Sequence, residues 1–175
     1  IFVLSNADII RSGATTIPEV LRYVPGVHVG QVNGHTFAVS VRGLSGSLSN
    51  KLLVMIDGRT VYSPLFAGAV WSKENPPIED IDRMEVIRGP GGSGWGANAF
   101  KGVINIITKT AGETLGSYAQ VRTGNEDKAA FEARHGFKVA DDSAVRVFSK
   151  FERRDAARNT AGAGDEDDWD SARVG

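Results

Sequence analysis

The chain has 175 residues, with 20 basic and 21 acidic side chains, so its formal net charge is −1. This charge gives no general attraction to nucleic acid, and the absence of cysteine excludes disulfides, thiolate zinc sites and cysteine nucleophiles. A hydrophobic fraction of 41% is enough for a folded core. No apolar run of about 18 residues is present, so no helix is expected to span a membrane. The chain does not begin with methionine, and we expect it to be a piece of a longer protein.

Two short helices are expected first. Residues 5–8 read Ser-x-x-Asp and residues 16–19 read Thr-x-x-Glu, and both are capping boxes. After the second box, apolar residues at positions i, i+3, i+4 and i+7 predict a helix that continues to Val24. Pro25-Gly26 then ends this helix.

Short strands separated by loops follow up to about residue 110. The expected strands are residues 27–29, 37–42, 52–56, 59–62, 83–88 and 103–109. Asp57-Gly58 is a favoured tight turn between two of them. The expected loops are residues 30–36, 43–50, 63–75 and the glycine-rich residues 89–96, with a short helical turn at residues 76–81.

The pattern changes after residue 110, where apolar and polar residues alternate. Residues 118–123, 129–138 and 145–152 predict antiparallel strands, and another strand is expected near Ala172 after a polar loop. Three such strands alone leave apolar faces and an edge without partners. Strands of about ten residues with alternately short and long connections are a weak signature of a membrane β-barrel, and soluble β-sandwiches share this pattern.

No motif supports an enzyme. Residues 94–99 match the dinucleotide pattern G-x-G-x-x-A, but the strand expected soon afterwards leaves no room for the required helix. His28 and His35 lack a third metal ligand nearby, and the acidic residues 165–170 lack the central glycine of a calcium loop. The carboxylates of residues 79–85 interleave with arginines, which favours an ion-paired surface. We therefore expect no catalytic residue, no metal and no cofactor.

Five motifs carry a family resemblance through their order and spacing. They are LRYVPGV at residues 21–27, VRG at 41–43, LVMIDGR at 53–59, IDRMEVIRGP at 81–90 and GWGANAFKGVINIITK at 94–109. This series closely resembles the plug domain of TonB-dependent outer-membrane receptors, and the residues that follow resemble the first barrel strands of that family. Trp95 stands where the family usually has tyrosine, and residues 98–102 are less rich in glycine than usual.

The resemblance implies an α+β fold and two parts. Residues 1–110 are expected to form the plug domain, with a small mixed β-sheet and short helices. Residues 111–175 are expected to form antiparallel hairpin strands of an incomplete transmembrane β-barrel. In this family the plug fills the lumen of a barrel of about 22 strands. The expected location is therefore the outer membrane of a Gram-negative bacterium.

The resemblance also implies transport rather than catalysis. Such receptors import a scarce nutrient, often a ferric siderophore and sometimes cobalamin, haem or a sugar, and TonB supplies the energy. The expected partners are TonB, bound through an N-terminal segment that this sequence lacks, the chain's own C-terminal barrel and a small nutrient such as a metal chelate. Two alternatives are a plug-containing receptor used for signalling or adhesion without import, and a soluble nucleotide-binding enzyme.

Candidate site residues follow from the family's apical loops, which by position are residues 30–36 and 62–73. The candidate ligand contacts are Gln31, Asn33, His35, Tyr62, Phe66 and Trp71. Aromatic side chains suit a bulky chelate, although Phe66 and Trp71 could instead pack the loop against the barrel. The loops hold no obvious basic cluster for a strongly anionic ligand. Arg42 and Arg88 match plug arginines that pair with barrel glutamates, with ordinary strand-end arginines as the alternative.

Overall fold

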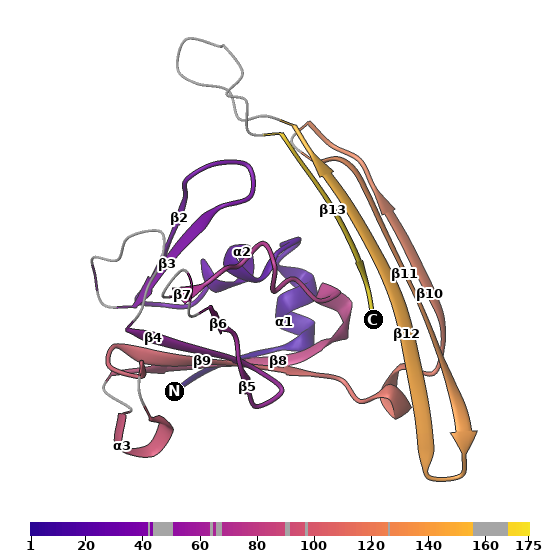
Figure 1. Cartoon of the computed structure of the whole chain (residues 1–175), viewed down its shortest axis with the longest axis horizontal. Helices are drawn as coiled ribbons and strands as arrows, with labels where there is room; N and C mark the ends of the chain where they lie inside the picture. Colours follow the sequence, from indigo (N-terminus) through magenta and orange to yellow (C-terminus); the bar gives the residue numbers. More distant parts are fainter. Residues whose placement is uncertain are drawn as a thin grey trace. The chain divides into compact units, whose positions relative to one another are not determined.

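The structure is a computed structural model that describes residues 1–41, 43, 51–63, 65, 68–89, 92–96, 98–125, 127–155 and 168–175. Two of the candidate residues, Arg42 and Phe66, lie outside the described residues, as does most of the loop expected at 43–50. The chain forms two compact units (Figure 1). Unit 1 comprises residues 1–32 and 36–108, and unit 2 comprises residues 33–35 and 109–175.

Unit 1 begins with strand β1 (Phe2–Ser5) and helices α1 (Asn6–Arg11) and α2 (Ile17–Leu21). Both helices start at the capping boxes that the sequence predicts. Helix α2 ends at Leu21, so the prediction that it continues to Val24 is wrong. The residues after Leu21 form turns instead, in which the amide of Val24 donates to the carbonyl of Leu21 at 3.1 Å.

A five-stranded sheet forms the centre of unit 1. Its strand order is β1-β8-β9-β4-β5, in which β4 and β9 are parallel and the other pairs antiparallel, so the predicted mixed sheet is confirmed. The strands are β4 (Leu52–Ile56), β5 (Arg59–Thr60), β8 (Ile81–Arg88) and β9 (Gly102–Thr108). Ile9 and Leu21 of the helices and Met84 and Ile104 of the sheet are fully buried in one core.

The remaining elements of unit 1 are short. They are β2 (Val27–Gln31), β3 (Phe37–Val41), β6 (Tyr62–Ser63), β7 (Gly68–Ala69), the 3₁₀ turn η1 (Ile78–Asp80) and α3 (Gly92–Trp95). Three loop predictions need correction. Strand β2 runs to Gln31 and shortens the loop expected at 30–36. The strand expected at 59–62 is divided into β5 and β6, and β6 pairs with β7 inside the loop expected at 63–75. Helix α3 lies in the glycine-rich loop.

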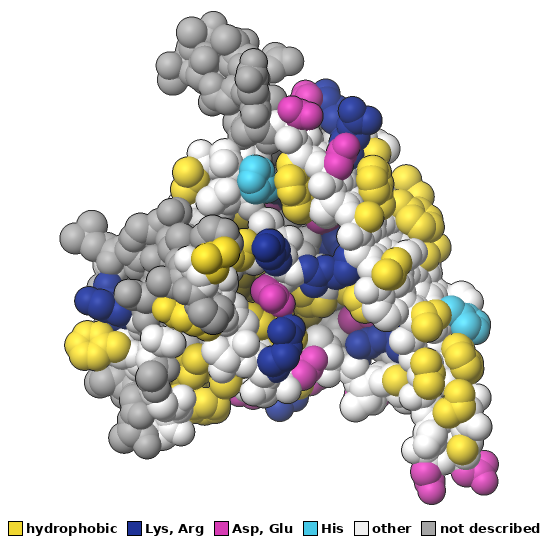
Figure 2. All heavy atoms as spheres, viewed as in Figure 1, with side chains coloured by type: hydrophobic (Ala, Val, Ile, Leu, Met, Phe, Trp, Pro, Cys, Tyr) yellow, Lys and Arg dark blue, Asp and Glu magenta, His cyan; other side chains and the backbone are white. Residues whose placement is uncertain are grey.

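Unit 2 is an antiparallel sheet whose four strands lie in chain order. After the 3₁₀ turn η2 (Ala111–Thr114), its strands are β10 (Gly116–Arg122), β11 (Asp127–Ala140), β12 (Ser143–Arg154) and β13 (Trp169–Val174). The predicted alternation is confirmed, because Val121, Phe131 and Phe151 are exposed on one face while Glu132 and Lys150 are buried on the other. Hydrophobic side chains gather along one face of this sheet in Figure 2. No described helix combines the length and the apolar character that crossing a bilayer requires.

Candidate functional site

The first candidate loop is the tip of a hairpin formed by β2 and β3. Val27 pairs with Val41, and Val29 pairs with Val39. Val39 and Val41 of β3 are buried in the core of unit 1, whereas the residues of β2 beyond Val27 are partly or fully exposed. The core therefore anchors the hairpin mainly through β3.

Local hydrogen bonds shape the tip of this hairpin. The amide of Val32 donates to the carbonyl of Thr36 at 2.8 Å, and the amide of His35 donates to Oδ1 of Asn33 at 3.1 Å. This second bond is a side-chain turn of the kind that asparagine favours. Within unit 2, the ring of His35 stacks on that of Trp169 with 5.6 Å between ring centroids. The side chains of Asn33 and His35 thus have defined local contacts.

The other predicted ligand contacts in the described residues lie on different elements of unit 1. Gln31 is exposed at the end of β2, and Tyr62 is half-buried in β6 opposite Ala69. Trp71 is only 7% exposed and lies in the core of unit 1, a position that neither the ligand contact nor the packing against the barrel describes. Gln31, Asn33 and His35 therefore share one hairpin, while Trp71 belongs to the core. In the described part of the chain, no three His, Asp or Glu side chains gather as metal ligands.

Arg88 makes a contact that sequence reasoning missed. At the end of β8, its Nη1 atom donates to the carbonyl of Pro25 at 2.8 Å. Pro25 precedes Gly26, which has a φ of +77° and leads directly into β2. Sixty-three positions separate the two partners, so no local pattern could have revealed this contact.

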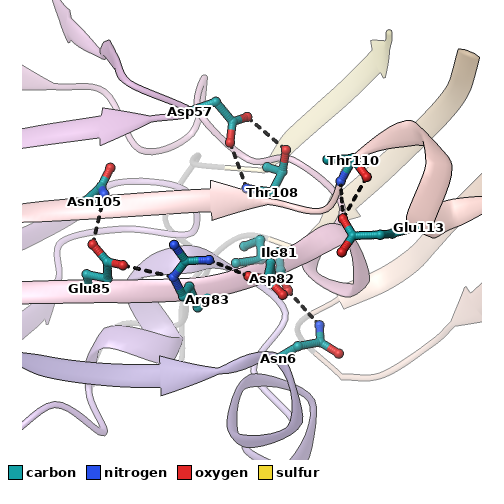
Figure 3. A network of polar contacts seen from close by, with 10 residues as sticks. All are labelled: Asn6, Asp57, Ile81, Asp82, Arg83, Glu85, Asn105, Thr108, Thr110 and Glu113. Carbon is teal, nitrogen blue, oxygen red and sulfur yellow. Dashed lines mark hydrogen bonds and ion pairs between the residues drawn. The ribbon is translucent and has the colours of Figure 1, made fainter. Parts of the chain in front are cut away.

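Asp57 makes long-range hydrogen bonds in addition to forming the predicted turn. The predicted Asp-Gly turn is present, with Asp57 at a φ of 50°. In addition, the Asp57 carboxylate accepts hydrogen bonds from the amide and from the hydroxyl of Thr108, each at 2.8 Å (Figure 3). Thr108 is the last residue of β9, so the side chain of the turn holds the end of a neighbouring strand.

The carboxylates of β8 form ion pairs, as the sequence predicts. Arg83 donates from Nε to Glu85 at 2.9 Å and from Nη1 to Asp82 at 2.7 Å, and Asn105 donates to Glu85 at 3.1 Å (Figure 3). The hydrogen bond from Arg83, followed by that from Asn105, lowers the pKa of Glu85 below its ordinary value. A carboxylate held in its charged form in this way is poorly suited to general acid catalysis.

Unit 2 contains a buried charged cluster, which we define as Arg122, Glu132, Lys150 and Glu152. The Nζ atom of Lys150 lies 3.2 Å from Oε1 of Glu152 and 4.0 Å from Oε2 of Glu132. The Nη2 atom of Arg122 lies 3.9 Å from the same oxygen of Glu152. Each carboxylate of this cluster therefore has a cation within 4.0 Å, as buried charges require.

Known proteins with similar sequences include a vitamin transporter and an outer membrane protein. Over 149 residues the chain is 34% identical to the vitamin B12 transporter BtuB of Vibrio vulnificus strain CMCP6, an alignment that covers 84% of this chain and 22% of that protein. Over 178 residues it is 31% identical to the iron-regulated outer membrane virulence protein of Vibrio cholerae serotype O1, which covers 94% and 26%. The chain thus spans about a quarter of the length of these relatives.

A solved structure supports the same fold. The ferric-catecholate import receptor Fiu of E. coli K12 superposes with a TM-score of 0.66 and 28% identity, over 90% of this chain and 22% of that one. The predicted fold class, a plug domain followed by antiparallel hairpin strands of an unclosed barrel, is therefore confirmed.

The family model of the TonB-dependent receptor plug domain matches residues 1–103. The relatives are outer-membrane receptors of Gram-negative bacteria, which confirms the location that the sequence predicts. The hairpin of β2 and β3 lies within the matched residues, which also cover the mixed sheet and the ordered motifs up to the start of β9. The chain therefore belongs to the TonB-dependent receptors, of which it carries the plug domain.

Proposed function

We propose that this chain is the plug, with the first barrel strands, of a receptor that imports a scarce nutrient across the outer membrane with energy from TonB. The match of residues 1–103 to the plug family is the observation that carries the proposal. The sheet of unit 2 supports it, because one face is apolar and the other is polar, as in a strand pair between lipid and a hydrated lumen. Transport is a property of the intact parent protein.

A bulky metal chelate is the ligand that we propose. One relative is named for vitamin B12 and one structural neighbour for a ferric catecholate, and both compounds carry a metal in a large organic ligand. Gln31, Asn33, His35 and Tyr62 offer amide, imidazole and phenol groups that could hold such a compound. Phe66 belongs, like Tyr62, to the candidate loop at residues 62–73. Trp71 would support this loop from the core.

Ion pairs with the barrel would hold the plug in place, and a pulling force from TonB would move it. We propose that Arg42 and Arg88 pair with glutamates of the barrel beyond this chain, since a guanidinium in a partly buried lumen needs an anionic partner. TonB would bind a segment that precedes residue 1 and pull on it. Transport of this kind makes and breaks no covalent bond, so we propose that the protein is not an enzyme.

Uptake by whole cells tests this proposal. The intact parent would be expressed in cells that lack their own receptors, with labelled cyanocobalamin and a labelled ferric catecholate as probes. We expect uptake of one probe that disappears in a strain without TonB, and a heat-dependent shift of the parent on gels. A folded outer-membrane protein that takes up neither probe would contradict the proposed ligand class. A probe that binds to the cells without entering would support the signalling or adhesion alternative.

A further inference from the structure

A tight turn joins α2 to the β2–β3 hairpin. The amide of Val27 donates to the carbonyl of Val24 at 3.1 Å, with Pro25 and Gly26 between them. Proline at the second position and glycine with a φ of +77° at the third are the features of a type II turn. A type I turn would instead require a φ of about −90° at the third position, and its central peptide group would be flipped.

Arg88 binds the peptide group that distinguishes the two turns. Its Nη1 atom donates to the carbonyl of Pro25, which is the central carbonyl of the turn. A Cβ atom added to Gly26 would lie 3.4 Å from this nitrogen and 3.6 Å from Cδ of Arg88, so the side chain lies directly against the turn. Flipping the central peptide would turn the carbonyl away from the guanidinium. The hydrogen bond therefore favours the type II form.

The turn matters for the hairpin because it sets the start of β2, the more exposed of the two strands. Val27 is the first residue of β2 and is buried, whereas His28 and Gln31 are exposed. The neighbouring strand β3 is held by the core, and the direction of β2 depends on the turn before it, on pairing with β3 and on the packing of Val29 against the core.

We infer that Arg88 is a positioning residue for the β2–β3 hairpin: through the turn it fixes the direction of β2, which carries Gln31 at its end. Through Pro25 it links the end of β8 to the candidate ligand loop. A conformational change at the end of β8 therefore alters the conformation of this loop, and the reverse also holds. The link between Arg88 and the hairpin rests on the geometry, and its effect on ligand binding rests on the proposed function.

Hydrogen exchange of the purified, intact parent protein tests the link. Arg88→Gln removes the charged donor to Pro25, and we expect amides of residues 27–31 to exchange about fivefold faster, because the hydrogen bond that favours the type II turn is lost. Arg88→Lys keeps a cationic donor and should restore part of the protection. Amides of residues 102–108 in β9 should be unchanged in both variants.

Two controls separate this link from general effects. Gly13 has a φ of +69° and no atom within 4 Å of an added Cβ, so Gly13→Ala strains the backbone as Gly26→Ala does but without an arginine nearby. Arg83→Gln removes another arginine from β8, whose side-chain hydrogen bonds within the described residues go to its neighbours Asp82 and Glu85. Neither control should alter exchange in β2. Unchanged exchange in Arg88→Gln, or an equal effect in both controls, would overturn the inference.

Uptake measurements test the consequence for ligand binding. Gly26→Ala keeps the guanidinium but disfavours the type II turn, so we expect the half-saturating concentration of cyanocobalamin or ferric catecholate to rise about fivefold. The maximal rate and the amount of receptor in the membrane should not change, and Gly13→Ala should resemble the unmodified protein. An unchanged half-saturating concentration in Gly26→Ala would refute the ligand part. Absence of uptake by the unmodified parent would instead refute the proposed function, and the exchange result would still decide the role of Arg88.

Discussion

Arg122 and Glu152 form an ion pair although a whole strand lies between them. Their nearest atoms are 3.9 Å apart, and β11 separates β10 from β12. Ala130 of β11 lies opposite both residues in the register, and its methyl group leaves room for the two long side chains to meet. Lys150 joins them from the next row, where it lies directly opposite Glu132. The cluster therefore depends on one register of three strands.

Replacing Lys150 by methionine should destabilise the parent protein strongly. The Lys150 side chain is 3% exposed, and the Glu132 and Glu152 side chains are 5% and 6% exposed. Removing the cation leaves an excess of buried negative charge, which costs about 3 kcal/mol of unfolding free energy. Urea titration of the parent in lipid vesicles measures this loss. Adding Glu132→Gln to Lys150→Met should recover much of it, because the charge is again balanced.

An exposed ion pair in the same sheet is the matched control. Nε of Arg153 lies 3.6 Å from Oδ1 of Asp170, and their side chains are 64% and 61% exposed. Arg153→Met should change the unfolding free energy by less than about 1 kcal/mol, because water screens the pair. An equal loss of unfolding free energy in Lys150→Met and Arg153→Met would show that the burial of the cluster does not increase the cost of removing its cation.

Removing the carboxylate of Asp57 should loosen the end of β9. Asp57→Gly keeps the positive φ that the turn requires but deletes both hydrogen bonds to Thr108. The expected loss is about 1–2 kcal/mol of local stability, since each hydrogen bond contributes about 1 kcal/mol. Hydrogen exchange at the amide of Thr108 in the parent measures it. Asp57→Asn, which retains an acceptor and tolerates positive φ, should show a smaller change; equal changes would contradict the role of these bonds.

The sequence predicted local structure well because short-range patterns determine it. The capping boxes before α1 and α2, the Asp57-Gly58 turn and the alternating strands of unit 2 were all predicted and are all present. Helix α2 was predicted too long, because Val24 continues the apolar periodicity although it lies in a turn. Val24 is buried in the core, at 1% exposure, although it is not helical. Its apolar character therefore reflects this burial and not a continuation of the helix.

Long-range contacts could not be predicted from one sequence. The parallel pairing of β4 with β9 joins strands that are distant in the chain, and the contact of Arg88 with Pro25 depends on that sheet. Trp71 shows why the site residues could not all be predicted from the sequence. An aromatic residue in a predicted loop suits a ligand surface and a core equally, and only the folded chain shows that it is buried.

Adding a side chain at Gly136 should disturb the start of unit 2. A Cβ atom there would collide with the carbonyl oxygen of Thr114 and would lie 3.2 Å from Cα of Leu115. The backbone must move to accept it, so Gly136→Ala should cost about 2 kcal/mol of unfolding free energy. Gly112→Ala is the control, because its Cβ would meet only Oγ1 of Thr110 at 3.9 Å. Urea titration of both variants of the parent should show a loss for Gly136→Ala alone; equal midpoints would refute the close approach.

The hydrogen bonds to Glu85 should make the stability of β8 and β9 depend on acid pH. Arg83 first and Asn105 second lower the pKa of Glu85 from its ordinary value of 4.5. Because the folded pKa lies below the unfolded one, the stabilisation is present above the unfolded value and is lost as pH falls through the folded value. Its size is below about 1 kcal/mol, since solvent screens the pair, and the Arg83 side chain is 44% exposed.

Glu85→Gln tests this dependence, because glutamine keeps an acceptor but does not titrate. In the intact parent, amides of β8 and β9 should lose protection between about pH 6 and pH 3, after correction for intrinsic exchange, and the loss should be smaller in Glu85→Gln. Glu113→Gln is the control in unit 2, where hydrogen bonds from Thr110 lower the pKa of Glu113. It should alter the pH dependence only near η2. The same pH profile for β8 and β9 in Glu85→Gln and the unmodified protein would show that another group titrates there.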